Sequence, residues 1–237
     1  MPITKIKKII KLLTPPILIP SVFRECLNYL IRGKDKISYE NNFYKRHAFI
    51  NKAIQKYNNC KYLEIGVDNN EVFNTIPLPI KNKIGVDPVR GGRRRITSDE
   101  FFKTNNIKFD VIFIDGLHEY EQCQRDCINS IKSINKGGII FFHDFLPRNS
   151  LEAHVPRKQA VWTGDVWKVA IEINNSKFMD FRIANIDMGV GILKPKENSE
   201  YIKIPELKKL KFDDFFEKYY GKLPIVNSEE ALKFIES

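Results

Sequence analysis

Hydrophobic and polar positions follow one another in distinct blocks, most clearly over residues 109–144. Residues 109–114 are a nearly unbroken apolar run, as expected of a strand buried on both faces of a parallel sheet. Residues 119–134 then place apolar side chains at helical spacing, and Lys136-Gly137-Gly138 ends that pattern. Residues 139–142 are again apolar. The block therefore predicts a strand, a helix and a second strand.

Two shorter apolar runs lie upstream, at residues 60–66 and 83–87. Each predicts a strand, and residues 42–57 predict the helix before the first of them. This alternation of strand and helix is typical of a doubly wound, Rossmann-like α/β sheet with helices on both faces.

Downstream of residue 145 the pattern becomes less regular. Residues 148–163 are polar and predict a loop that faces a substrate. The remaining elements expected from the pattern are a helix at 165–174, a closing pair of strands at 181–186 and 189–193, and two short helices at 212–219 and 229–235.

Length and composition indicate one domain with short appendages. The chain has 237 residues, of which 43% are hydrophobic, and this is enough for a single core. Residues 1–40 are expected to form a basic helical extension, interrupted by Pro15, Pro16 and Pro20. Residues 41–195 are expected to form the α/β domain, and residues 196–237 a helical tail.

Polar residues follow the end of each predicted strand. Since the carboxyl ends of parallel strands meet at one edge of a sheet, these residues are expected to share a ligand-binding crevice. Glu64-Ile65-Gly66 lacks the G-x-G-x-x-G spacing of a dinucleotide loop, which argues against a nicotinamide enzyme. Asp87 comes 21 residues after Gly66, a separation at which a carboxylate can bind the hydroxyls of a ribose. The ligand implied is a nucleoside without a pyrophosphate.

Several ordered motifs then resemble a known family. They are YLEIGV at 62–67, GVDPVRGG at 85–92, TSDEFF at 97–102, FIDGLHEYEQCQRD at 113–126, GGIIFFHDFLP at 137–147, TGDVWKVA at 163–170 and DMGVGI at 187–192. Together they resemble the class I S-adenosylmethionine-dependent methyltransferases, in particular the bacterial group related to the macrolide-sugar O-methyltransferases. The resemblance implies a seven-stranded, mostly parallel sheet with a reversed final strand, and methyl transfer to an oxygen.

The resemblance also implies roles for the residues at the strand ends. S-adenosylmethionine is expected to contact Glu64, Gly66 and Asp68 with its methionine portion and Asp87 with its ribose. Ser98 with Asp99 would face the adenine, and Asp115 would contact the cofactor or a metal ion. The family's first loop usually reads E-x-G-x-x-x-G, whereas this chain has Asn70 in place of the second Gly. Asn tolerates a left-handed backbone better than other non-Gly residues, so the turn is expected to form.

Removal of a hydroxyl proton is the chemical problem of an O-methyltransferase, and His118 is the first candidate for the base. It follows Asp115 in a D-x-x-H arrangement that supplies the base in the sugar O-methyltransferases; the alternative is a histidine that only orders the turn. Asp115 and Asp144 end adjacent strands and are the candidate ligands of a Mg²⁺ ion. Without the ion, Asp144 would orient a histidine. His143 is expected on the opposite face from Asp144, because strand side chains alternate, and His154 is a reserve candidate.

The formal net charge is +10, concentrated in the N-terminus and in the loop over residues 90–95. Residues 3–13 place isoleucine and leucine at helical spacing among lysines, a pattern that suits either an anionic membrane surface or packing against protein, including a second subunit. The arginines of the loop suit nucleic acid phosphates, but no accompanying aromatic surface supports that reading. A solvated loop, or one that meets an acidic substrate, is the better interpretation.

The cysteines at positions 26, 60, 123 and 127 form no disulfide framework, so buried thiols in a reduced compartment are expected. No apolar run approaches a membrane span, and Lys11 and Pro15-Pro16 interrupt the pattern of a signal peptide. The sequence thus predicts a cytoplasmic enzyme, with peripheral contact to the inner membrane face left open.

The favoured function is S-adenosylmethionine-dependent O-methylation of a small-molecule or glycan acceptor, by family analogy a sugar in a surface polysaccharide or a secondary metabolite. Two alternatives stay open. An RNA methyltransferase would use the basic surface, although an acceptor-base motif such as Asn-Pro-Pro-Tyr is absent. A non-catalytic, membrane-tethered adaptor would not need the polar residues at the strand ends.

Overall fold

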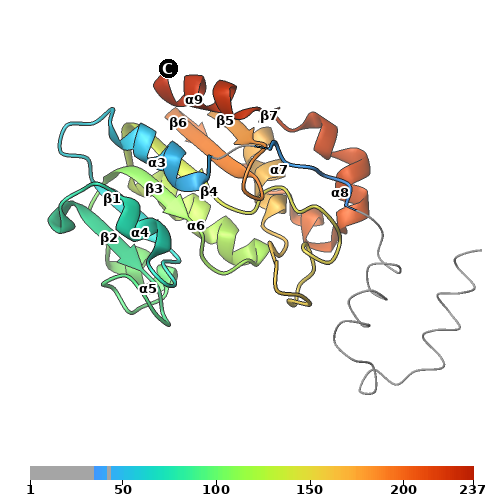
Figure 1. Ribbon diagram of the computed structural model, residues 1–237, viewed down its shortest axis with the longest axis horizontal. Helices are drawn as coiled ribbons and strands as arrows, with labels where there is room; N and C mark the ends of the chain where they lie inside the picture. Colours follow the sequence, from blue (N-terminus) through green and yellow to red (C-terminus); the bar gives the residue numbers. More distant parts are fainter. Residues whose placement is uncertain (1–34, 42–43) are drawn as a thin grey trace, which may run out of the picture.

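The computed structural model describes residues 35–41 and 44–237, which contain a seven-stranded sheet with the strand order β2-β1-β3-β4-β6-β5-β7 (Figure 1). Of the basic helical extension predicted over residues 1–40, residues 1–34, with the pattern at 3–13, lie outside the described residues, and residues 35–40 form no helix. The strands are β1 (Tyr62–Ile65), β2 (Lys83–Val86), β3 (Phe109–Ile114), β4 (Ile134–Phe142), β5 (Lys177–Ala184), β6 (Val190–Glu200) and β7 (Ile225–Val226).

The sheet is mostly parallel, as the sequence predicts. β1 pairs in parallel with β2 and β3, and β3 pairs in parallel with β4. β6 runs antiparallel to both of its neighbours, β4 and β5. The reversed strand is therefore not the final one, because β7 follows it and pairs in parallel with β5. The boundary expected between residues 195 and 196 falls inside β6, so part of the C-terminal segment completes the sheet.

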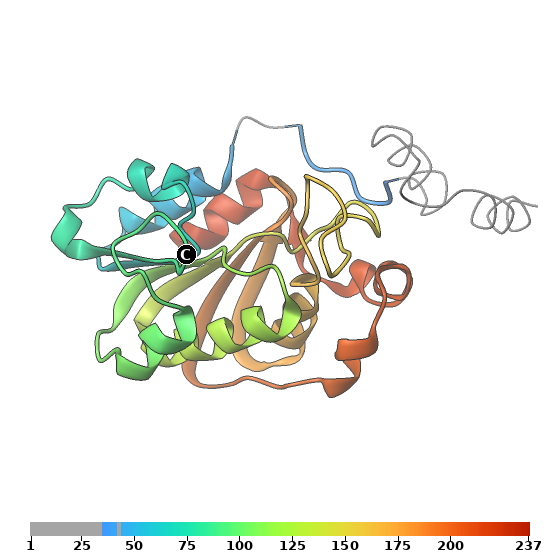
Figure 2. The same cartoon turned by 90° about the horizontal axis from the view of Figure 1, so that it is seen from below.

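Helices cover both faces of the sheet (Figure 2). One face carries α3 (Arg46–Ile54), α4 (Glu71–Thr75) and α9 (Ser228–Glu236), and the other carries α5 (Ser98–Thr104), α6 (Tyr120–Ser133) and α7 (Trp167–Asn175). The helix α8 (Phe212–Lys218) lies beside α7, and its Phe215 ring contacts Trp167 at a centroid distance of 4.4 Å. The doubly wound architecture expected from the alternation of strands and helices is confirmed.

Two apolar cores, one on each face, follow from the alternation of side chains along the strands. In β3, Ile112 and Ile114 belong to the core under α6 and α7, whereas Val111 and Phe113 belong to the core under α3 and α9. All four are at most 3% exposed. The unbroken apolar run of this strand is thus explained by burial on both of its faces.

The predicted elements agree with the observed ones within three residues at each end, except at four places. Two of these are β5, which begins at Lys177 instead of 181, and β6, which extends to Glu200 instead of 193. The helix expected over 42–57 spans only Arg46–Ile54. The strand expected at 139–142 begins earlier, at Ile134, with a register irregularity between Phe109 and Val111 of its partner. The segment 148–163 forms neither helix nor strand, as expected of a loop.

Residues 35–41 run extended across the domain before α3. Ile37 is buried, and the Tyr39 hydroxyl donates to the carbonyl of Leu146 at 2.6 Å. The backbone N–H of Lys36 donates to the carbonyl of Arg148 at 2.8 Å. Residues 35–39 therefore lie beside the start of the 148–163 loop.

Candidate active site

A cleft of about 1020 Å³ opens at the carboxyl ends of the parallel strands. The loops that follow β1, β2, β3 and β4 line it, together with the segment Ala160 to Trp162. Apart from Asp99 and the reserve candidate His154, every residue assigned a site role in the sequence lines this one cleft. These residues are Glu64, Gly66, Asp68, Asp87, Ser98, Asp115, His118, His143 and Asp144. The convergence expected of parallel strand ends is thus observed.

Gly66 fixes the approach of the first loop to the third strand. Its φ angle is +83°, and a Cβ atom there would lie 2.1 Å from the carbonyl oxygen of Asp115. No other residue type fits this position without moving the backbone. The glycine therefore brings the end of β1 against the end of β3 and shapes the floor of the cleft.

Asn70 takes the left-handed conformation that the sequence predicts, with φ of +65°. Its side-chain oxygen also accepts a hydrogen bond from the backbone N–H of Gly92 at 2.8 Å. Asparagine thus forms the turn that a glycine would form, and in addition connects the loop after β1 to the loop after β2.

Glu64 is a buried carboxyl group at the end of β1. The hydroxyl of Tyr62 donates to it at 2.6 Å. Burial raises the pKa of Glu64 to about 8, and the hydrogen bond from Tyr62 only partly offsets that effect. The free protein therefore carries Glu64 largely protonated at neutral pH, and a cationic ligand beside it would favour the carboxylate and release the proton to solvent.

Asp87 stands at the end of β2 and organises the loop after it. Its carboxylate accepts the backbone N–H groups of Asp68 at 3.0 Å, Val89 at 2.8 Å and Arg90 at 2.9 Å. Burial alone would raise its pKa, but these N–H groups outweigh burial and lower it. A fixed, ionised carboxylate at this position suits the two hydroxyls of a ribose.

The far end of the cleft differs from the expectation in one residue. Ser98 lines the cleft and its hydroxyl accepts from the side-chain nitrogen of Gln122 at 3.0 Å. Asp99, expected to share the adenine side, is instead exposed and pairs with Arg125 at 3.3 Å. The two residues open α5, where consecutive side chains point in different directions. The buried Asp126 lines the cleft in place of Asp99, and its carboxylate accepts a hydrogen bond from the side chain of Gln122 at 3.1 Å.

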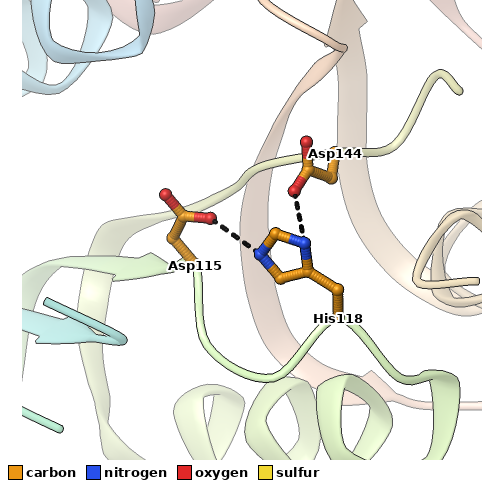
Figure 3. Close-up of side chains that lie close together, drawn as sticks. All are labelled: Asp115, His118 and Asp144. Carbon is orange, nitrogen blue, oxygen red and sulfur yellow. Dashed lines mark ion pairs between the residues drawn. The ribbon is translucent and has the colours of Figure 1, made fainter. Parts of the chain in front are cut away.

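His118 lies between two carboxylates at the centre of the cleft (Figure 3). Its Nδ1 is 3.1 Å from an oxygen of Asp144, and its Nε2 is 3.6 Å from an oxygen of Asp115. Burial lowers the pKa of His118, but the two carboxylates outweigh burial and raise it to about 9. The imidazole is therefore held in place and strongly basic.

His143 contradicts the expectation that it faces away from Asp144. Its Nδ1 is 3.3 Å from Asp115 and 3.3 Å from Asp144, while its Nε2 is 3.7 Å from Asp187. β4 has already ended at Phe142, and Asp144 has a left-handed backbone with φ of +66°. The alternation of strand side chains therefore does not extend to this pair. The neighbouring carboxylates raise the pKa of His143 despite its burial.

Arg46 and Asp187 extend this network toward α3. The guanidinium of Arg46 lies 3.0 Å from Asp187 and 3.6 Å from Asp115. The carboxylate of Asp187 also accepts the backbone N–H of Arg46 at 3.0 Å. Three acids, two histidines and one arginine thus share one polar cluster, which orients the side chains around His118.

The 148–163 loop forms the wall beside His118. The carbonyl oxygen of Trp162 lies 2.9 Å from Nδ1 of His118, and the two rings stack with centroids 5.1 Å apart. Gly164, with φ of +62°, follows so closely that a Cβ atom would lie 1.7 Å from the His118 carbonyl. Asp165 then accepts the backbone N–H of Tyr120 at 2.7 Å. The loop thus fixes both the ring and the backbone of the candidate base.

The loop itself is closed at its base. Glu152 is fully buried and accepts the side chain and the backbone N–H of Arg148, each at 2.8 Å. The carbonyl of Glu152 accepts the N–H groups of Thr163 at 3.1 Å and Gly164 at 3.0 Å. The first and last parts of the loop are therefore joined at one point.

A divalent cation fits these side chains by the chemistry of the donors. Ligand atoms of Asp115, His118 and Asp144 lie within 4.8 Å of one another. The buried Oδ1 of Asp144 makes no hydrogen bond among the described residues, and its ion-pair contact is Nδ1 of His143 at 3.3 Å. Carboxylate oxygens are the ligands that Mg²⁺ prefers.

Sequence reasoning did not identify Arg46, Asp126, Asp187 and Trp162 as site residues. Asp126 and Asp187 belong to motifs that carry the family resemblance, so their acidic side chains gave a usable signal. Arg46 gave none. Trp162 belongs to the loop predicted to face a substrate, but its contact with His118 was not predicted, because it depends on how the 148–163 loop packs against the sheet. Cys60, Cys123 and Cys127 are buried free thiols, as expected.

Residues 79–145 match a family model described as a methyltransferase domain. The matched segment extends from the residues before β2 to the turn at Asp144 and contains His118. The sequence resemblance to methyltransferases is thereby confirmed over this segment. A search of curated proteins finds no significant match.

Solved structures with similar chains include several methyltransferases. A putative O-methyltransferase from Klebsiella pneumoniae is 12% identical with a TM-score of 0.48, covering 80% of this chain and 94% of its own. An O-methyltransferase from Bacillus cereus in complex with SAH is 11% identical with a TM-score of 0.45, covering 82% and 89%. The MycE methyltransferase of the mycinamycin pathway, in complex with Mg, SAH and mycinamycin VI, is 14% identical with a TM-score of 0.38, covering 61% and 47%. Similarity at this level identifies neither a substrate nor a cofactor.

Proposed function

We propose that this methyltransferase domain transfers a methyl group from S-adenosylmethionine to a hydroxyl of a small-molecule or glycan acceptor, with His118 as the general base. One observation carries the proposal: a histidine held between two carboxylates shares a cleft with Gly66 and with Asp87, the residues suited to the cofactor. A sugar of a surface polysaccharide or of a secondary metabolite is the proposed acceptor.

The cofactor would lie along the cleft from Ser98 to the end of β1. Asp87 would bind its ribose through Oδ2, because Oδ1 already accepts two backbone N–H groups, whereas Oδ2 accepts the N–H of Asp68 and keeps a lone pair for a hydroxyl. Glu64 and the backbone of Gly66 and Asp68 would enclose the methionine portion. When bound, S-adenosylmethionine supplies a methyl group on a cationic sulfur, so the protein must align the acceptor and remove its proton.

His118 is placed to take that proton on Nε2. Its Nδ1 faces the carbonyl of Trp162 and the carboxylate of Asp144, which favours a proton on Nδ1 and leaves Nε2 as the acceptor. Asp144 and Asp115 then stabilise the imidazolium that forms. Because the pKa of His118 is about 9, the neutral form is a minor species at pH 7.

Asp115 and Asp144 would hold a Mg²⁺ ion, with His118 beside them. Such an ion would lower the pKa of a coordinated hydroxyl, so that a base removes its proton more easily.

Calorimetric titration with S-adenosylmethionine, with and without Mg²⁺, tests the first half of the proposal. Binding of the cofactor and of SAH, without binding of NAD, is the expected result. Transfer of labelled methyl groups to sugars rather than to RNA tests the second half. A protein that ignores S-adenosylmethionine at millimolar concentration, in both conditions, contradicts the proposal.

A further inference from the structure

Three arginines line the cleft, and one of them differs from the other two. Arg46 pairs with Asp187 and Asp115, and Arg90 pairs with Asp68. Arg157 has no carboxylate partner among the residues that the structure describes. Arg157 is exposed to solvent, and its planar donors match a carboxylate or a phosphate of a bound molecule. The partner of Arg157 is therefore to be sought in a ligand.

Arg157 is nevertheless held in position. Its Nε donates to the carbonyl of Gln159 at 2.9 Å, and one terminal nitrogen donates to the carbonyl of Ala160. The guanidinium also lies over the Trp162 ring, 5.8 Å from the centroid. These contacts use two of the five N–H groups of the side chain and neutralise no charge. The remaining donors have no partner in the described part of the chain, so a preorganised cation stays available for an anion.

The position of Arg157 relates it to the acceptor rather than to the cofactor. The indole ring over which it lies is the ring that stacks on His118, the proposed base. Its neighbours Ala160, Val161 and Trp162 form the wall on that side, and Val161 is 44% exposed. The residues suited to ribose and adenine lie elsewhere in the chain, because Asp87 follows β2 and Ser98 opens α5.

We propose that Arg157 binds an anionic group of the acceptor, a carboxylate or a phosphate, so that the molecule methylated is acidic. The inference rests on the proposed function, since it assigns His118 and its surroundings to the acceptor. It goes beyond that function by naming the charge of the substrate and the side chain that selects it. The loop of residues 148–163 then acts as the specificity element, and Arg157 as its anion-binding residue.

The test uses the full chain saturated with SAH, so that only the acceptor half of the cleft is free. D-glucuronate, D-glucose 6-phosphate and D-glucose are titrated separately by calorimetry. The two anionic sugars separate the carboxylate from the phosphate source, and D-glucose is the neutral reference. The expected result is at least about tenfold tighter binding of one anionic sugar than of glucose.

Arg157→Gln should lower the affinity for the preferred anionic sugar about 10- to 100-fold and leave glucose unchanged. Lys158→Gln is the matched control, because Lys158 is an exposed neighbouring cation that does not line the cleft. Arg157→Lys should bind the anionic sugar more tightly than Arg157→Gln but less tightly than the wild-type protein, because lysine keeps the positive charge and lacks the planar guanidinium.

Three results overturn the inference. They are equal or undetectable binding of the anionic and neutral sugars, a preference that survives in Arg157→Gln, and a preference that Lys158→Gln removes equally. The preceding titration with SAH tests the cofactor half of the proposed function separately. A protein that binds SAH without preferring anions thus refutes the role of Arg157 alone.

Discussion

Glu64 should make the affinity for S-adenosylmethionine depend strongly on pH. This side chain is 1% exposed, and burial raises its pKa to about 8. Under the proposed function it faces the methionine portion of the cofactor. An ammonium group beside it favours the ionised carboxylate, so the cofactor binds the ionised protein and releases a proton.

The size of the effect follows from the fraction of Glu64 that is ionised before binding. With a pKa of about 8 this fraction is about 0.3% at about pH 5.5 and about 9% at about pH 7. The affinity should therefore rise about 30-fold over this interval, or about 2 kcal/mol. The α-amino group of the ligand does not interfere, because its pKa lies at about 7.7–8.0 in model compounds.

Calorimetry at the two pH values, in buffers of different ionisation enthalpy, measures both the affinity and the protons released. About 0.9 proton should leave per cofactor bound at about pH 7. Glu64→Gln should bind with little dependence on pH. Asp126→Asn is the necessary control, because burial also raises the pKa of Asp126, to about 6, so that this group titrates in the same interval.

An affinity of the wild-type protein that stays constant over the interval would refute this reasoning. So would a Glu64→Gln variant with the same slope and the same proton release. If only Asp126→Asn loses the dependence of cofactor affinity on pH, the titrating group is Asp126, on the adenine side of the cleft.

Three further predictions concern the donor, the base and the N-terminus. Asp87→Ala should lose about 1.5–3 kcal/mol of cofactor binding with an unchanged circular dichroism spectrum, and unchanged affinity would exclude the ribose role. His118→Ala should keep cofactor binding while turnover falls about 10²–10⁴-fold, and near-normal turnover of this variant would place the base elsewhere. With a chelator present, the rate of the wild-type protein should rise with pH until about pH 9, where His118 loses its proton. Deletion of residues 1–13 should abolish any salt-sensitive binding to anionic vesicles, whereas indifference of the intact protein to such vesicles at low salt would assign that segment to packing.

The sheet could be predicted where its strands are continuously apolar. β3 is buried on both faces, and its run of six residues has no other simple explanation. β7 could not be predicted, because two half-buried residues, Ile225 and Val226, carry no periodic signal. Its pairing with β5 depends on how the chain returns after α8.

In the part of the chain that the structure describes, no helix is long and apolar enough to cross a membrane.

The candidate site was also predictable only in part from the sequence. Glu64, Asp87, Asp115 and Asp144 could be placed together because each lies at the end of a parallel strand or just after it, and such strands end at one edge. The contacts that orient His118 could not be placed. Trp162 comes from a loop 44 residues later in the chain, and its carbonyl reaches the imidazole only because that loop folds back.

The closure of that loop by Glu152 has a consequence for how this protein can change. The Glu152 carbonyl accepts the N–H groups of residues 163 and 164, so residues 153–162 form a loop that is closed at its base. The tip of such a loop can lengthen, shorten or be exchanged at small entropic cost. The segment Trp162 to Gly164 cannot vary with it, since it supports His118. Acceptor choice and proton removal are thus encoded a few residues apart yet free to evolve separately, and a transplanted tip offers a route to new acceptors on an unaltered catalytic base.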